Sequence, residues 1–487
     1  MGKITTRAEL IDALRVASEL EHQLMAQYLF AVYSLKRYTY EGLEPVLLER
    51  VRRWSSSITL IARQEMEHLG LALNLLSSIG GTPSFTRPNM PQRADYYGQA
   101  GIKLELTRGD LDTIKRFQRF EAPDPLIKDL EPGEPIDQAE ANEWCDRTDH
   151  LAGSRAKVTA ILESKAKALK GAPVLSFGWD SIQDLYQDIY EGFETLCAEP
   201  CGEKGLFVGR PSLQIFGGPG GKQPVGSMDD LNQYGVDLIG VTDLASAKQA
   251  ITMILEQGEG ISVKPSYLPW THFCLFTGIR EDMEAFDKEG LAARPVVRNP
   301  MTRRWPDVCP QDEVTLLTNP HTIEVAKLFN GSYELMLLML LYLYSDNIKT
   351  QEQVNGMMDG AFFPLMTMFV RPLAEILTEL PAFKDDSEAK DGLTNAGPGF
   401  ELNGDVLLVP TLDATWDIFQ ERIDTLVLGF DALLAGDDPW IDLPNQLEDG
   451  QTHSRIWQRL EYLRSQMRRL AYDWRVKWNI GYGSTGG

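Results

Sequence analysis

The feature that most constrains this fold is a long amphipathic segment, residues 44–80, with two ionisable side chains in the middle of its apolar face. Steps of three and four residues follow one face of the segment, and that face is apolar except at Glu65 and His68. Such a stripe is typical of a helix that packs into a bundle, and Gly80 predicts where the helix ends. Because an uncompensated buried charge is strongly unfavourable, both side chains need partners. A Glu-x-x-His pair alone fits a buried salt bridge as well as a metal site.

A preceding helix, predicted at residues 6–37, repeats the pattern with a single acid. Thr6 and Glu9 are spaced as in a capping box, which predicts the start of this helix, and Glu21 lies in the middle of its apolar stripe. Bundle proteins that hold two metal ions use one Glu from each of two helices and a Glu-x-x-His from each of the other two. Carboxylates bridge cations, and imidazoles leave positions open for oxygen or substrate, so the two helices indicate a di-metal site.

A third helix is predicted at residues 180–198, and it contains two glutamates. Glu194 borders the apolar stripe of this segment, whereas Glu191 points nearly opposite to the stripe. We therefore expect Glu194 to be the inward-facing carboxylate.

A fourth helix is predicted at residues 242–257, and its acid is ambiguous. Glu259 lies closer to the apolar side than Glu256, unless the helix ends at Gly258 and the projection fails there. No histidine stands three residues after either acid. His272 is the nearest one downstream, and it could complete the site only if the chain folds back.

Several segments, taken in order along the chain, resemble a known ferritin-like family. They are ELEHQLMAQYLFAVYSL, EMEHLGLALNLLSSIGGTP, LYQDIYEGFETL, EQGEG, THFCLF and NAGPGFEL, and they span about residues 5–402. The chain is similar in these motifs to the iminophenyl-pyruvate dimer synthases of violacein and rebeccamycin biosynthesis. The resemblance implies a ferritin-like fold and a metal site whose ligands, mapped by motif, are Glu21, Glu65, His68, Glu194, Glu259 and His272.

Composition narrows the class of protein. The chain has 487 residues, with 47 basic and 70 acidic side chains and a formal charge of −23, which argues against nucleic acid or an anionic membrane as a partner. The five cysteines lack zinc-finger spacing, and we expect no disulfide framework. No apolar run is long enough to cross a bilayer, and the first residues lack an apolar signal core. These features favour a reducing cytoplasm.

The predicted fold class is all-α, a ferritin-like four-helix bundle with long insertions plus a second C-terminal helical region. We place the di-metal bundle and its inserted crossover segments in residues 1–300, and the C-terminal helical region, packed on the bundle, in residues 301–487. The long connection between the second and third helices allows these two helices to lie parallel. Further helices are predicted near residues 138–170, 319–346, 351–380, 412–434 and 452–475.

The predicted function is that of a non-haem di-metal oxidase or oxygenase that uses O2 and two metal ions, which we expect to be iron. The resemblance implies a small amino-acid-derived substrate from specialised metabolism. Alternatives are a ferroxidase or other iron-handling protein, and a metal-stabilised binding protein without catalysis. Tyr28, on the stripe of Glu21, could border a substrate cavity, although core packing is the simpler interpretation. The sequence leaves a homo-oligomer open.

Overall fold

The protein is described by a computed structural model, and nearly all of its regular structure is helical. The only strands in the described part are β1 (Pro300–Met301) and β2 (Thr315–Leu316), which pair in parallel. The structure describes residues 4–93, 96, 103–127, 129–131, 133–146, 179, 181–198, 205–215, 238–258, 271–345, 364–408, 411–447 and 451–478.

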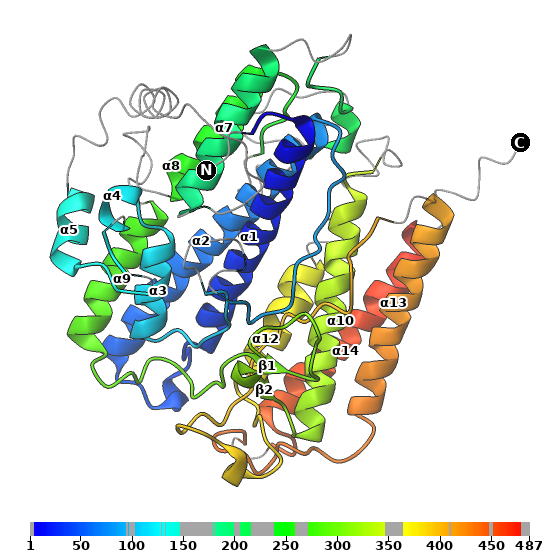
Figure 1. The fold of residues 1–487 in the computed structure, drawn as a ribbon. Helices are drawn as coiled ribbons and strands as arrows, with labels where there is room; N and C mark the ends of the chain where they lie inside the picture. Colours follow the sequence, from blue (N-terminus) through cyan, green and yellow to red (C-terminus); the bar gives the residue numbers. More distant parts are fainter. Residues whose placement is uncertain are drawn as a thin grey trace, which may run out of the picture.

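Four helices form the bundle predicted from the sequence. They are α1 (Arg7–Ser34), α2 (Pro45–Ser78), α7 (Ile182–Ala198) and α8 (Leu244–Gly258). α1 packs on α2 and α7, and α8 packs on α7 and α2, so the four helices close a ring around a common core (Figure 1). The expected all-α, ferritin-like fold is therefore confirmed, with helix bounds within a few residues of those predicted.

Helices from the insertions pack against one side of this bundle. α3 (Leu111–Phe120), α4 (Asp124–Ile127) and α5 (Gln138–Asp146) come from the connection between α2 and α7. α9 (His272–Phe286) contacts α2, α3 and α5, and so ties this group to the bundle (Figure 1). The helix expected at residues 138–170 is seen as α5, and its remaining residues lie outside the described part.

The C-terminal helices lie on the opposite side of α1 and α2 from α3, α5 and α9 (Figure 1). They are α10 (Pro320–Tyr342), α12 (Arg371–Leu377), α13 (Leu412–Leu433) and α14 (Arg455–Asp473), with π-helical turns at Leu365–Val370 and Trp474–Trp478. A single apolar core runs from Ile4 to Trp474 and crosses residue 300 without a break. The expected division into residues 1–300 and 301–487 therefore stays a prediction, namely that the two regions fold as separate units.

The ends of the two long helices follow their local sequence. Thr6 and Glu9 form the predicted capping box of α1. α2 ends where the sequence predicts, because Gly80 adopts a φ of 86°, and the amides of Gly80 and Gly81 donate to the carbonyls of Ser77 and Leu76. This pattern satisfies the last carbonyls of the helix with a left-handed glycine.

Two of the cysteines form a disulfide bond that the sequence did not lead us to expect. Cys145 at the end of α5 and Cys274 in the first turn of α9 are joined, with Cα atoms 5.7 Å apart and a sequence separation of 129. The spacing of the cysteines could not reveal this pair, since it depends on how α5 docks on α9.

Short 3-10 turns complete the regular structure of the described part. They occur at Thr39–Glu41, Pro211–Leu213, Gln311–Glu313 and Asp386–Glu388. None of the described helices is long and apolar enough to cross a membrane.

Candidate metal centre

Glu65, in the middle of α2, lies between two histidines. Its Oε2 is 3.2 Å from Nδ1 of His68, one turn further along the same helix, and its Oε1 is 2.9 Å from Nδ1 of His272. The two imidazole rings are 5.4 Å apart between centroids. Each oxygen of one carboxylate therefore faces a different imidazole.

A second carboxylate completes each half of the site. Glu21 of α1 places Oε2 3.7 Å from Nδ1 of His68, and Glu121, which follows α3, places Oε2 3.4 Å from Nδ1 of His272. Two groups of possible metal ligands result, Glu21–Glu65–His68 and Glu65–Glu121–His272, and within each group the donor atoms lie within 4.8 Å of one another. Glu65 belongs to both groups.

Two glutamines orient the imidazoles. The side-chain oxygen of Gln257 in α8 is 2.9 Å from Nε2 of His68, and that of Gln64 in α2 is 3.2 Å from Nε2 of His272. An amide oxygen can only accept, so each Nε2 carries a proton and donates it. A neutral imidazole then has a lone pair at Nδ1, which is the atom that faces the carboxylates. Outer hydrogen bonds of this kind fix the ring orientation of metal-binding histidines.

Two tyrosines donate to the outer carboxylates. The Tyr186 hydroxyl on α7 donates to Oε1 of Glu21 over 2.5 Å, and the Tyr28 hydroxyl on α1 donates to Oε1 of Glu121. Both tyrosines are fully buried. Their hydrogen bonds hold one oxygen of each carboxylate and leave the other oxygen directed at the histidines.

The centre is buried and rich in negative charge. Glu21, Glu65, His68, Glu121 and His272 all have 0–3% exposure. Burial, together with the charge of Glu65, raises the pKa of Glu21 to about 8. Burial works to lower the pKa of His272, but the carboxylates of Glu65 and Glu121 outweigh it and raise that pKa to about 9. Protons thus supply part of the positive charge that three buried carboxylates require when no cation is bound.

The donor set fits two divalent cations. Three carboxylates and two imidazoles are the hard oxygen and nitrogen ligands that iron and manganese accept in helical bundles. Two such ions would also replace the protons as the source of compensating charge. A structural salt-bridge cluster would use the same contacts, but it would not need one carboxylate to serve two equivalent acid–histidine sets.

The structure brings together four of the six residues predicted as ligands: Glu21, Glu65, His68 and His272. Glu194 lies elsewhere, on a half-exposed part of α7 where it forms a salt bridge with Lys248. Glu194 is at the border of the apolar stripe, and its side chain does not reach the centre. The residue of α7 that contacts the centre is Tyr186, which donates to Glu21.

The predicted acid of the fourth helix stays a prediction. The described part of α8 reaches Gly258, and Glu259 lies just outside the described residues. Within α8, Gln257 contacts the centre through its hydrogen bond with His68.

Glu121 was missed by the sequence reasoning. It follows α3, a helix of ten residues inserted between the bundle helices, and no apolar stripe of a long helix passes through it. A weak signal existed, because Phe117 and Phe120 show that this end of α3 is buried and Glu121 comes next. Tyr28, which the sequence placed beside a possible substrate cavity, donates to Glu121. It does not line either of the two cavities described below, one beside α3 and one on the outer face of α2.

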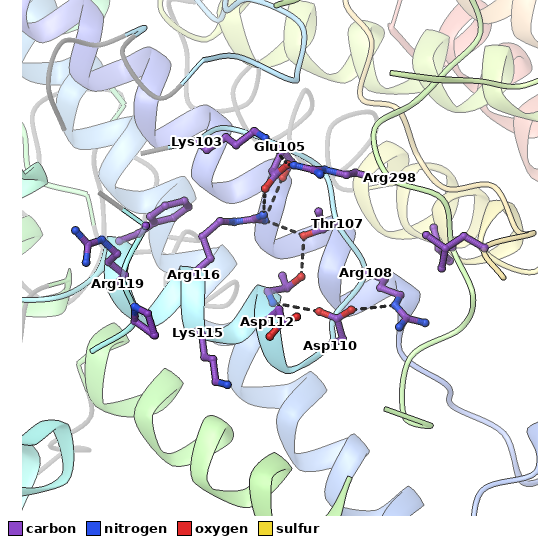
Figure 2. A pocket seen from close by; sticks show the side chains of 16 residues that line it. Lys103, Glu105, Thr107, Arg108, Asp110, Asp112, Lys115, Arg116, Arg119 and Arg298 are labelled. Atoms are coloured by element: carbon purple, nitrogen blue, oxygen red, sulfur yellow. Dashed lines mark hydrogen bonds and ion pairs between the residues drawn. The ribbon is translucent and has the colours of Figure 1, made fainter. Parts of the chain in front are cut away.

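A cavity of about 590 Å³ lies on the outer side of α3, where Figure 2 shows its charged lining. Arg116 and Phe120 line it, and the Arg116 guanidinium lies over the rings of Phe117 and Phe120. Phe117 packs edge-on against Tyr28, with ring centroids 4.6 Å apart. A layer of aromatic rings therefore separates this cavity from the tyrosine that contacts Glu121.

The fold and the buried centre agree with the comparison with protein families. The model of a family described as ferritin-like matches residues 14–281, which is more than half of the chain. The chain belongs to the ferritin-like family.

Individual relatives are more distant. The chain is 25% identical over 447 residues to dichlorochromopyrrolate synthase of Lentzea aerocolonigenes, a match that covers 84% of this chain and 37% of the relative. It is 24% identical over 492 residues to 2-imino-3-(indol-3-yl)propanoate dimerase of Chromobacterium violaceum, covering 96% of this chain and 40% of the relative. The chain thus spans less than half the length of these curated relatives.

A solved structure was also matched, a ferritin-like protein from Caulobacter vibrioides. The match has a TM-score of 0.34 at 18% sequence identity and covers 74% of this chain and 96% of that one.

Proposed function

We propose that the chain is a di-metal oxidase or oxygenase that acts on a small amino-acid-derived molecule. The observation that supports this proposal best is Glu65, which directs one oxygen to each of two buried acid–histidine sets. In this proposal Glu21 and His68 would hold one ion, Glu121 and His272 would hold the other, and Glu65 would serve both. Two iron ions bound there would supply the redox chemistry with O2.

The protein's own residues would position the ions and keep the site dry. Gln257 and Gln64 hold the two imidazoles with Nδ1 inward. Tyr186 and Tyr28 hold the outer carboxylates by hydrogen bonds. Because these groups are already hydrogen-bonded and buried, little reorganisation is needed when the ions bind.

The proposed substrate class comes from the relatives. One is named as a dimerase of 2-imino-3-(indol-3-yl)propanoate, an imino acid with an indole side chain, and the other as a synthase of dichlorochromopyrrolate. We therefore propose a small, amino-acid-derived substrate with an aromatic ring for this chain.

Metal content per chain tests the proposed ligands. After loading with ferrous iron under anaerobic conditions, the wild-type chain should hold two ions, and Glu65→Ala should lose both because its carboxylate serves each site. Glu21→Ala and Glu121→Ala should each lose one. Glu194→Ala is the matched control, since its partner is Lys248 on the surface, and it should keep two. Full metal content in Glu65→Ala would falsify the bridge.

Oxygen consumption separates a substrate-using enzyme from an iron-handling protein. The iron-loaded chain should react slowly with O2 alone, and an indole-bearing 2-imino acid should accelerate the reaction. Rapid oxidation of many ferrous ions per chain without any organic ligand would instead identify a ferroxidase.

A further inference from the structure

A second cavity, of about 690 Å³, lies on the outer face of α2 and has an unusual charge. Its lining includes five basic side chains and a single acid, in a chain whose net charge is −23. The basic residues are Lys36 and Arg37 after α1, Arg52 and Arg63 on α2, and Arg371 at the start of α12; the acid is Glu375.

Part of this positive charge is not compensated by the protein. Arg37 and Arg371 share one oxygen of Glu375, at 3.1 and 2.8 Å. Within the described ranges Arg52 and Arg63 form no salt bridge, whereas the charge of Lys36 interacts with the carboxylate of Asp287. Like charges held together without partners repel one another, so binding of an anion in the cavity would stabilise the folded protein.

The cavity beside α3 provides a comparison, because it also contains many basic residues but compensates them. Figure 2 shows Arg116 and Arg298 directed at the buried carboxylate of Glu105, and Lys103 is 2.6 Å from Glu313. The cations there hold the protein together. In contrast, Arg52 and Arg63 on α2 line the second cavity and form no salt bridge with a described residue.

Two buried donors of the second cavity also lack an acceptor. The Nε of Arg37 and the hydroxyl of Ser55 are buried and make no hydrogen bond to any residue that the structure describes. Leaving a buried donor unsatisfied is costly, and more so for a charged group. Ser56 and Thr59, one turn apart on α2, also lie in this wall, and their hydroxyls donate to the backbone carbonyls of Arg52 and Ser55.

We propose that this cavity on the outer face of α2 is a binding site for a small phosphate-bearing anion. Guanidinium groups bind phosphate oxygens with several N–H donors at once, four of the five cations are arginines, and the Ser55 hydroxyl is a further donor without an acceptor. The volume is that of a site for a small organic ligand. A nucleic acid fits less well, because a long polyanion would be repelled by the rest of an acidic chain.

The proposal is independent of the proposed metal chemistry. Arg52 and Arg63 are exposed, whereas Glu65 and His68 are buried on the other side of the same helix. The anion site therefore needs no metal ion. To keep phosphate from binding to metal, the experiment uses the chelator-treated full chain and repeats it in Glu65→Ala.

Calorimetric titration with inorganic pyrophosphate tests the site. The full chain should bind one pyrophosphate, and the affinity should be the same in Glu65→Ala. In Arg52→Gln/Arg63→Gln it should fall roughly ten-fold for each arginine removed. The matched control is Arg15→Gln/Arg53→Gln, which changes the net charge equally but removes two exposed arginines outside the cavity, paired with Asp12 and Glu49. The control should bind within about two-fold of wild type.

Three results would overturn the proposal. One is the absence of saturable pyrophosphate binding to the wild-type chain. Another is an equal loss of affinity in the control and the cavity variant, which would indicate a general charge effect. The third is a short oligonucleotide that displaces pyrophosphate and binds more tightly, which would make the surface a polymer site.

Discussion

At the scale of single residues, the centre depends on how buried charges are balanced. Glu21, Glu65 and Glu121 bring three carboxylates into a space with almost no exposure. In the metal-free chain, the neighbouring carboxylates raise the pKa values of His68 and His272 against the effect of burial, so both imidazoles hold compensating protons. Metal ions and protons thus compete for the same groups.

This competition predicts how stability depends on pH. The folded-state pKa values of Glu21 and His272 are raised to about 8 and about 9, so the folded chain holds protons there that the unfolded chain has released. Stability of the metal-free chain should therefore fall as pH rises, from about 4.5 to 8 for Glu21 and from about 6.5 to 9 for His272. Denaturant unfolding at several pH values measures this slope.

The variant Glu21→Gln provides the control for that slope. A glutamine cannot ionise, so the part of the pH dependence between about 4.5 and 8 should shrink, while the part due to His272 remains. In the wild-type chain, metal affinity should increase with pH, whereas the stability of the metal-free chain falls. At higher pH fewer protons must be displaced when the ions bind. An unchanged slope in Glu21→Gln would contradict the assignment.

At the scale of elements, close approaches between backbones hold the ends of the bundle helices. Gly209, in the segment before α8, donates its amide to the carbonyl of Ser78 at the end of α2. A Cβ added at Gly209 would lie 1.9 Å from the carbonyl oxygen of Ser77. Only a residue without a side chain allows this contact.

We therefore expect Gly209→Ala to destabilise the chain by about 1–3 kcal/mol, because the backbone must shift to relieve the overlap. Gly278→Ala is the matched control, since it lies on an exposed part of α9 with open space around its Cα. In a helix interior, alanine is favoured over glycine by about 0.5–1 kcal/mol, so this variant should be slightly more stable. Thermal unfolding of both variants measures the difference, and equal melting temperatures would refute the proposed contact.

At the scale of the whole molecule, the bundle and the C-terminal helices share one core. Arg294 links them by donating to the carbonyl of Tyr33 over 3.0 Å and to the hydroxyl of Thr378 over 2.9 Å. His22 on α1 also contacts the Tyr333 hydroxyl on α10. Polar and apolar contacts thus join the two regions that the sequence suggested as separate units.

We expect the described regions to unfold in a single transition that metal binding shifts as a whole. At a free metal concentration about 100 times the Kd, a site that binds only the folded state adds about 2.7 kcal/mol. Calorimetry with and without ferrous iron measures the shift. Two transitions, of which only one moves with metal, would instead show that residues 1–300 and 301–487 fold independently.

The sequence by itself determined the helices and the residues on their buried faces, because helix periodicity is local. Glu21, Glu65 and His68 were placed correctly on their stripes for that reason. Only the tertiary structure decided that Glu121 joins the centre, that Glu194 faces Lys248, and that Cys145 pairs with Cys274. Each of these contacts depends on how one helix docks on another, and the period of a single helix carries no information about docking.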